Sequence, residues 1–236
     1  MIIFDGDYDR IYRQMLDEDA KVKYYIDKLQ GGIVKKFRQQ RTFPIWHYEQ
    51  ITLPKSNNTY LIYYYVKDAV EANRMFNHFW GALLLLNTNN GNRLILSLRE
   101  VTLRELKIDT LKLKDHETHE LQVYSGHFFS RYRERMNLPQ EWSVNDIIAN
   151  FFGRNGYYFT QLDYNSIVLE KNRNKGNAAF AIEEGVTLGD ETITNDYHLV
   201  KHNTFLSLAE LKMDQDKATP GVTIMRDVVS HKKTAH

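Results

Sequence analysis

Cysteine is absent from the 236-residue sequence, which excludes a disulfide framework, thiolate zinc sites and cysteine nucleophiles. Long apolar runs are absent too: the longest, FWGALLLL at residues 79–86, is far short of the roughly 20 residues that span a bilayer. The N-terminal segment, MIIFDGDYDR, shows no basic stretch followed by an apolar one, so no signal peptide is expected. Together these absences predict a cytoplasmic protein with no membrane partner.

The sequence also has no excess of one charge, because 31 basic and 30 acidic side chains leave a formal net charge of +1. A protein without a strong overall field does not attract nucleic acid over its whole surface, so any anion-binding site must be local. Aromatic residues are plentiful, at 13% with 15 tyrosines. Tyrosine packs its ring and keeps a hydroxyl for hydrogen bonding, which is typical of shallow cores and contact surfaces.

The first half of the chain contains helix signals followed by strand signals. Apolar residues recur at helical spacing between Tyr8 and Arg41, and the Gly31-Gly32 pair is expected to split this stretch into two helices. Two later apolar runs flank an Asn-Asn-Gly, and Gly91 supplies the positive φ that a tight hairpin demands. We therefore predict N-terminal helices followed by an antiparallel sheet.

The second half begins with an amphipathic helix over residues 124–136. Ser143 and Asp146 form a variant capping box at the start of another helix, which Gly153 and Gly156 are expected to end. A last helix is expected to begin at Ser207, where Glu210 completes a capping box. The tail at 230–236 is basic and expected to be frayed. Short strands are expected between these helices, at 157–162, 166–170, 178–182, 185–189 and 196–206.

The length allows one large domain or two small ones, at roughly 100–200 residues per domain. A change of character near residue 118 predicts two α+β units, residues 1–118 of unknown role and residues 119–236. No long linker separates the two, so one continuous domain with a shared core is the alternative.

The segment YSGHFFSRYRERM, residues 124–136, has a polar side and an aromatic side at about 100° per residue. His127 lies in the first turn, where free backbone N–H groups lower the pKa of a histidine, and a neutral imidazole can act as a base. An arginine one turn on can hold a phosphate through its planar fork. The alternative is the solvated face of an ordinary helix. The polar stripe consists of His127, Arg131, Glu134 and Arg135.

The segment DYHLVKHNTFL, residues 196–206, has no cleanly apolar side when its residues alternate as in a strand. A polar side that faces a cleft explains this pattern, and so does a sheet edge. Lys201 and Thr204 are side chains of the kind that stabilise charge on a phosphoryl oxygen in a transition state. One predicted face bears His198, Val200, His202 and Thr204, and the other bears Leu199, Lys201, Asn203 and Phe205.

The histidines do not predict a metal site. The segment DHETHE, residues 115–120, fails the zinc-protease pattern because its two histidines are three residues apart rather than four. No ligand spacing supports a site that combines His119, His127, His198 and His202, which would have to meet through the fold alone. We expect neither a metal nor another cofactor.

Residues 124–207 combine an S-x-H-x-x-x-R-x-x-E-R helix, a second helix, and short strands of which the last ends in KHNTF. This order resembles the barnase/EndoU/colicin/RelE-like superfamily of small ribonuclease and toxin domains. The resemblance implies two helices packed on a curved antiparallel sheet. It also implies RNA cleavage by transfer of the 2′-hydroxyl onto the adjacent phosphate, without a metal. The first 118 residues do not share it.

The resemblance also implies roles for individual residues. His127 would be the general acid or base, and Arg131 and Arg135 would clamp the phosphate. Lys201 and Thr204 would complete the site from the sheet. Glu134 would orient the arginines or exchange a proton, and the candidate binding residues are Tyr124, Tyr132, His198 and His202, of which either histidine could be a second proton carrier.

Three functions remain open at this point. The first is a metal-independent endoribonuclease or toxin-like protein, with RNA and a cognate inhibitor protein as expected partners. The second is a non-catalytic protein that holds nucleic acid or an acidic partner on the basic helix and its tyrosines. The third is an accessory protein of a mobile element whose helix has no chemical role, because a fold does not establish a function.

Overall fold

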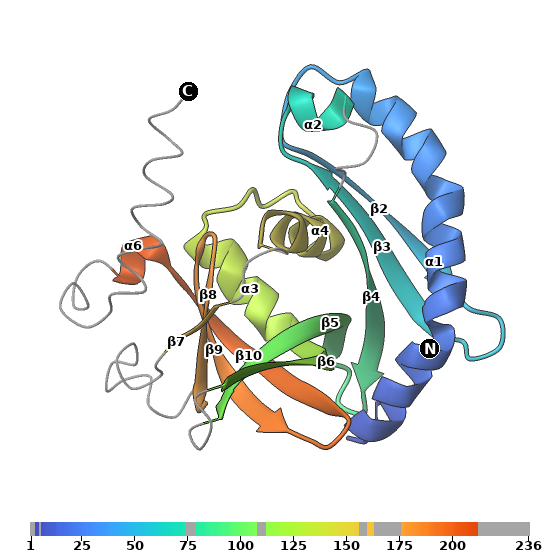
Figure 1. Ribbon diagram of the computed structural model, residues 1–236. Helices are drawn as coiled ribbons and strands as arrows, with labels where there is room; N and C mark the ends of the chain where they lie inside the picture. Colours follow the sequence, from blue (N-terminus) through green and yellow to red (C-terminus); the bar gives the residue numbers. More distant parts are fainter. Residues whose placement is uncertain are drawn as a thin grey trace.

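The computed structural model describes residues 3–4, 6–73, 79–107, 112–155, 160–162 and 176–211. They confirm the α+β class, with helices on a mostly antiparallel sheet whose strand order is β2-β3-β4-β5-β6-β10-β9-β8-β7 (Figure 1). β1 pairs with β4 beside this path, and β10 pairs with β6 in parallel. The elements are β1 (Ile3–Phe4), α1 (Tyr8–Arg38), β2 (Ile45–Thr52), β3 (Thr59–Val66), α2 (Ala69–Asn73), β4 (Phe79–Thr88), β5 (Arg93–Lys107), β6 (Lys112–Ser125), α3 (Gly126–Arg135), α4 (Val144–Asn155), β7 (Thr160–Leu162), β8 (Ala178–Ile182), β9 (Gly185–Ile193), β10 (Tyr197–Ser207) and α6 (Leu208–Leu211).

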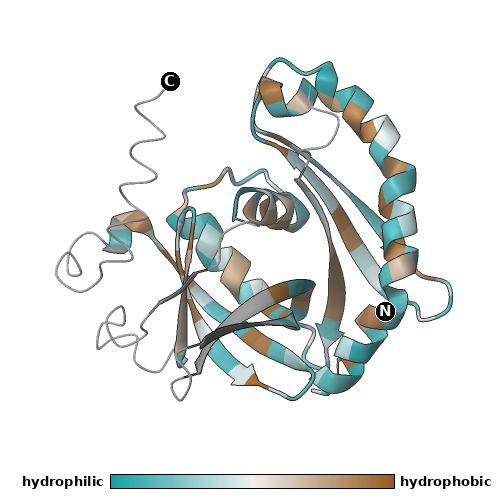
Figure 2. Cartoon of the chain, viewed as in Figure 1, coloured by the Kyte–Doolittle hydropathy of each residue, from teal (hydrophilic) through white to brown (hydrophobic). Residues whose placement is uncertain are grey.

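Helix α1 packs a single apolar stripe against one face of the sheet, and Figure 2 shows hydrophilic and hydrophobic residues mixed along it. Asp7 caps its start by accepting a hydrogen bond from the Arg10 amide at 2.9 Å. The prediction that Gly31-Gly32 splits this segment is wrong, because α1 is one helix of 31 residues. Burial of Ile26 and Ile33 on either side of the pair outweighs the roughly 1 kcal/mol that each helical glycine costs. None of the helices in the described part of the chain is long and apolar enough to cross a membrane.

Helices α3 and α4 pack on the other face of the sheet, around an aromatic core. Ser143 caps α4 as predicted: its Oγ accepts from the Asp146 amide at 3.1 Å, and Asp146 accepts from the Ser143 amide at 3.0 Å. Of the two glycines expected to end this helix, Gly153 lies inside it and Gly156 directly follows its last residue, Asn155. A Cβ atom at Gly153 would lie 2.4 Å from the Tyr65 ring, so the glycine allows close packing of α4 on β3.

Strands β4 and β5 form the predicted hairpin, with Gly91 at a φ of 75° in its turn. The two strands pair with each other only from Leu84↔Leu96 to Asn87↔Arg93. Before Leu84, β4 pairs only with β3, and after Leu96, β5 pairs only with β6. The sheet therefore opens between these two strands, as Figure 1 shows.

The proposed boundary at residues 118 and 119 falls inside β6, which pairs with β5 on one side and β10 on the other. A division there does not separate two sheets. The predicted strand at 166–170, the first part of the strand at 157–162, the extension of the last helix beyond residue 211 and the basic tail at 230–236 lie outside the described residues.

Candidate functional site

Helix α3 has the two-sided character that its sequence predicts. Ser125 is the N-cap, and its Oγ accepts a hydrogen bond from the Phe128 amide at 3.2 Å. Phe128, Phe129 and Tyr132 are buried between the sheet and α4. This aromatic side fixes the rotation of the helix, so its polar side faces outward. The outward stripe is His127, Arg131, Glu134 and Arg135.

The first part of this stripe is accessible to solvent. His127 is exposed and has no hydrogen-bond or ion-pair partner among the described residues. Arg131 and Glu134 form an ion pair at 2.8 Å, in which the side chains are 43% and 66% exposed. An exposed pair of this kind contributes at most about 1 kcal/mol, so a phosphate can compete with Glu134 for the arginine.

The last residue of the stripe reaches the final strand. The Arg135 guanidinium donates to the Thr204 hydroxyl of β10 at 3.4 Å and forms an ion pair with Glu210 of α6 at 3.0 Å. Glu210 is itself held by the predicted capping box, since it accepts from the Ser207 amide at 2.9 Å. The structure therefore brings together Arg135 and Thr204, and adds Glu210, which was predicted only as a helix cap.

Lys201 does not join this site. Its ammonium lies 4.6 Å above the Tyr8 ring, next to α1 on the other face of the sheet. The reason is strand alternation, because His202 faces α3 and its neighbour Lys201 must point the opposite way. A bulge between His202 and Thr204 shifts the register beyond this point, and Thr204 lies within reach of Arg135 of α3.

His202 is buried rather than accessible. Its ring stacks on Tyr124 with the centroids 4.3 Å apart, and its Nδ1 shares a hydrogen bond with the Thr187 hydroxyl at 2.9 Å. Burial lowers the pKa of His202 to about 3, so the imidazole is neutral near neutral pH. A histidine that is 1% exposed cannot exchange protons with a bound RNA.

Both predicted tyrosines are also buried, at 0% exposure. Tyr124 lies between the sheet and the helices, and its hydroxyl donates to Gln122 at 3.0 Å. The Tyr132 hydroxyl donates to Glu184, which also pairs with Arg154 at 2.5 Å. Neither ring can therefore act as a stacking surface for a base, and the interpretation of these tyrosines as binding residues is corrected to a role in the core.

His198 belongs to a buried charge network that the sequence analysis missed. Its Nε2 lies 2.5 Å from a Glu191 oxygen of β9, and its Nδ1 lies 3.6 Å from Glu120 of β6. Arg99 of β5 pairs with the same Glu120 at 2.5 Å. Four neighbouring strands thus present Arg99, Glu120, His198 and Glu191 in a row. The signal was the alternation of the polar Glu120 and Gln122 with the apolar Leu121 and Val123 in the second half of β6.

In this network, hydrogen bonds and neighbouring charges shift the pKa values in the direction opposite to the effect of burial. Burial would raise the pKa of the Glu120 carboxyl, but hydrogen bonds from His198 and the charge of Arg99 lower it to about 2. Hydrogen bonding to the Glu120 carboxylate raises the pKa of His198 against the opposing effect of burial, and the charge of Glu191 adds to the rise. His198 therefore keeps its proton to a higher pH than a free histidine, within the sheet and without a contact to the outward stripe of α3.

No group of three histidine, aspartate or glutamate side chains in the described part of the chain is placed to bind a metal. His119 lies on the α1 face, where its Nδ1 shares a hydrogen bond with the Tyr12 hydroxyl at 3.0 Å. It is thus separated from His127 on α3. The side chain of His116 lies outside the described part of the structure.

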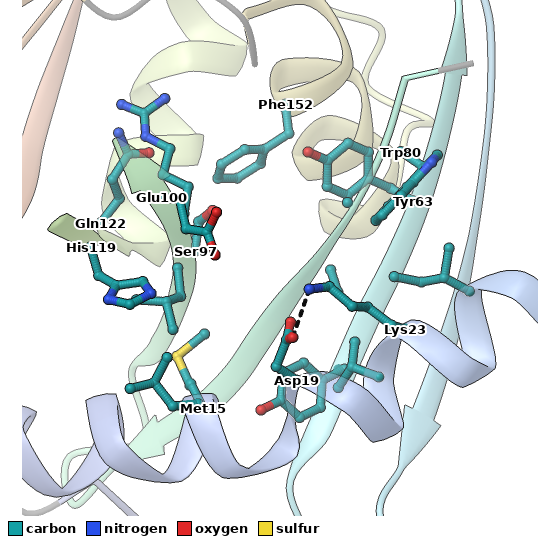
Figure 3. Close-up of a pocket in the computed structure, with 18 residues that line it drawn as sticks. Met15, Asp19, Lys23, Tyr63, Trp80, Ser97, Glu100, His119, Gln122 and Phe152 are labelled. Atoms are coloured by element: carbon teal, nitrogen blue, oxygen red, sulfur yellow. Dashed lines mark ion pairs between the residues drawn. The ribbon is translucent and has the colours of Figure 1, made fainter. Parts of the chain in front are cut away.

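A second concave region occupies the opening between β4 and β5, shown in Figure 3. Its volume is about 390 Å³, within the range of ligand-binding pockets. Side chains from α1, β4, β5, β6 and α4 converge on it, including Met15, Trp80, Ser97, Gln122 and Phe152. The sequence did not predict this cleft, because it depends on where two paired strands separate.

No family model matches the chain, and no significant match is found among curated proteins or solved structures. The resemblance to ribonuclease and toxin domains therefore stays a prediction. The chemistry available to the chain has to be inferred from the side chains on α3, β10 and the cleft.

Proposed function

We propose that this protein acts on RNA at the outward stripe of α3, as an endoribonuclease that needs no metal. One observation supports the proposal above others: Arg135 contacts Thr204 of β10, while His127 and Arg131 lie on the same outward side of α3. The proposed site is therefore a proton carrier, two guanidinium groups and a hydroxyl at the junction of a helix and a strand.

The proposed reaction uses these groups in a definite way. His127 removes the proton of the RNA 2′-hydroxyl, and the 2′-oxygen attacks the adjacent phosphorus as the bond to the 5′-oxygen breaks. Arg131 and Arg135 stabilise the charge on the phosphoryl oxygens, and Thr204 donates a hydrogen bond there. The departing 5′-oxygen takes its proton from water, because the Glu134 carboxylate on this side is already paired with Arg131. The product ends in a 2′,3′-cyclic phosphate.

Two carboxylates already hold the arginines that would bind the phosphate. Glu134 pairs with Arg131, and Glu210 pairs with Arg135. RNA binding on this side requires the phosphate to displace at least one carboxylate. Binding should therefore be modest in strength, and because only two arginines contact the phosphates it should weaken gradually with salt.

The test uses an end-labelled mixed-sequence RNA in EDTA, with the parent protein, His127→Ala and the control His47→Ala. His47 lies on β2 and pairs with Glu49 at 2.9 Å, so it is a surface histidine outside α3. Cleavage by the parent and by His47→Ala, but not by His127→Ala, supports the proposal. Equal cleavage by the parent and His127→Ala rejects it, and so does the absence of cleavage by the parent.

A second candidate is RNA binding without cleavage. It is favoured by the positions of His198 and His202, which are 5% and 1% exposed and so cannot serve as the second proton carrier. Tyr124 and Tyr132 are buried, so they cannot stack on RNA bases. The arginines of α3 therefore remain as the groups that would contact RNA, through its phosphates. A native gel with intact RNA tests this candidate: Arg131→Ala and Arg135→Ala should each weaken binding, and His127→Ala should leave it nearly unchanged.

A further inference from the structure

The opening between β4 and β5 leaves two strand edges without partners. The last pair that joins these strands is Leu84↔Leu96, whereas β4 remains paired with β3 as far as Phe79. Among the described residues, no ladder continues across the opening beyond that pair. A sheet edge with free backbone groups is a template for another strand.

The alternation of backbone groups identifies which residues face the opening. The Thr88 amide donates to the Asn92 carbonyl at 2.8 Å, so every second residue of β4 counted back from Thr88 points toward β5. Ala82 and Trp80 continue that set beyond the last pair. On β5, Leu98 and Glu100 continue the set in the same way.

The side chains around the opening are apolar at its base and acidic at its mouth. Trp80 is 39% exposed, Glu100 is exposed too, and Figure 3 shows them lining the cleft from β4 and β5. The charge of Asp19 is matched by Lys23, which lies 2.7 Å away. An adjoining pocket shares Glu100 and is also lined by the exposed carboxylates of Glu117 and Asp196. Arg99 also lines the cleft, but its guanidinium is paired with Glu120 at 2.5 Å. Glu100, Glu117 and Asp196 therefore leave the mouth with an excess of negative charge.

We propose that this cleft binds an extended basic peptide of a partner protein, which adds as a strand to the open edge of β5. The peptide backbone would pair with the groups of Leu98 and Glu100, which gives affinity without sequence preference. Its alternate cationic side chains would contact the acidic mouth and the face of Trp80. The inference does not depend on the proposed activity of α3, since the cleft is built from other elements.

The probe is acetyl-Val-Arg-Val-Arg-Val-amide, with the acidic counterpart acetyl-Val-Glu-Val-Glu-Val-amide as the matched control. Calorimetry of the full chain should show binding of the basic peptide and little binding of the acidic one. Glu100→Gln should weaken the basic peptide by roughly fivefold, since an exposed charge contact is removed. Glu141→Gln removes the same charge at an exposed position between α3 and α4 and should leave the affinity unchanged.

Hydrogen exchange then shows where the peptide binds. Saturating basic peptide should slow exchange of the Leu98 and Glu100 amides, because strand addition buries both in hydrogen bonds. Binding that leaves these amides unprotected overturns the proposal, as does equal affinity for the two peptides or no binding at millimolar peptide. Protection of the same amides by an RNA oligonucleotide, and not by the basic peptide, also overturns it. Because Glu100 is exposed, its variant should fold normally.

Discussion

His198 and His202 lie on the same side of β10, four residues apart, yet the surrounding sheet shifts their pKa values in opposite directions. The parallel pairing with β6 places His198 opposite Glu120 and His202 opposite Tyr124. The first histidine thus meets a carboxylate and the second meets an aromatic ring. We therefore expect one of these histidines to limit the stability of the fold at alkaline pH and the other to limit it at acid pH.

The alkaline limit should come from His198. The pKa of its imidazole is raised above 6.5 by hydrogen bonding to Glu120, despite burial, with a further rise from Glu191. A raised pKa in the folded state gives stability that is complete below pH 6.5 and is lost as the pH rises through the folded value. We expect the urea midpoint to fall above about pH 6.5, and to fall less steeply in His198→Gln. Equal slopes in the two proteins would contradict this.

The acid limit should come from His202, whose pKa burial lowers to about 3. The unfolded chain takes up a proton below pH 6.5 and the folded chain does not, so stability present above pH 6.5 is lost as the pH falls. The loss between about pH 6.5 and 5 should be roughly 2 kcal/mol. His202→Gln keeps an acceptor for Thr187 and should reduce this acid slope in urea titrations, even if it lowers stability at every pH. A slope that does not change would show that another group titrates.

Local signals predicted those parts of the fold that depend on neighbours in the sequence. The hairpin at Gly91 and the caps at Ser143 and Ser207 are fixed by a few adjacent residues, and all three are confirmed. The Gly31-Gly32 prediction failed because glycine propensity is a weak term beside the burial of an apolar stripe on a sheet.

The candidate site was predictable only in part, for reasons of register. The rotation of α3 follows from its aromatic side, so its outward residues were correctly placed. Strict alternation already places Lys201 on the side of β10 opposite to Thr204, so the assignment of Lys201 to the site did not follow from the strand pattern. The side on which Phe205 lies changes at a bulge, which alternation cannot represent. The network around His198 and the cleft beside Trp80 depend on which strands pair and where they separate. A single sequence does not reveal either.

Removing the carboxylate of Glu210 should strengthen RNA binding on α3. The Arg135 guanidinium now lies 3.0 Å from Glu210, and Glu210→Gln would free it for a phosphate while keeping a side chain that can cap Ser207. We expect roughly threefold tighter binding in a low-salt filter assay. Asp17→Asn makes the same charge change at an exposed position of α1 and should have little effect. Equal gains in both variants would mean that only net charge matters.

Two glycines of helices should respond oppositely to the same substitution. At Gly153 a new Cβ would lie 2.4 Å from the Tyr65 ring, so Gly153→Ala should push α4 from β3 and lower the unfolding free energy by about 1–3 kcal/mol. At Gly31 a new Cβ would meet nothing within 4 Å, so Gly31→Ala should stabilise α1 by up to about 1 kcal/mol. Urea denaturation at one pH measures both. A stabilising Gly153→Ala would mean that α4 does not pack against Tyr65 at this distance, and a destabilising Gly31→Ala would mean that α1 is not a continuous helix there.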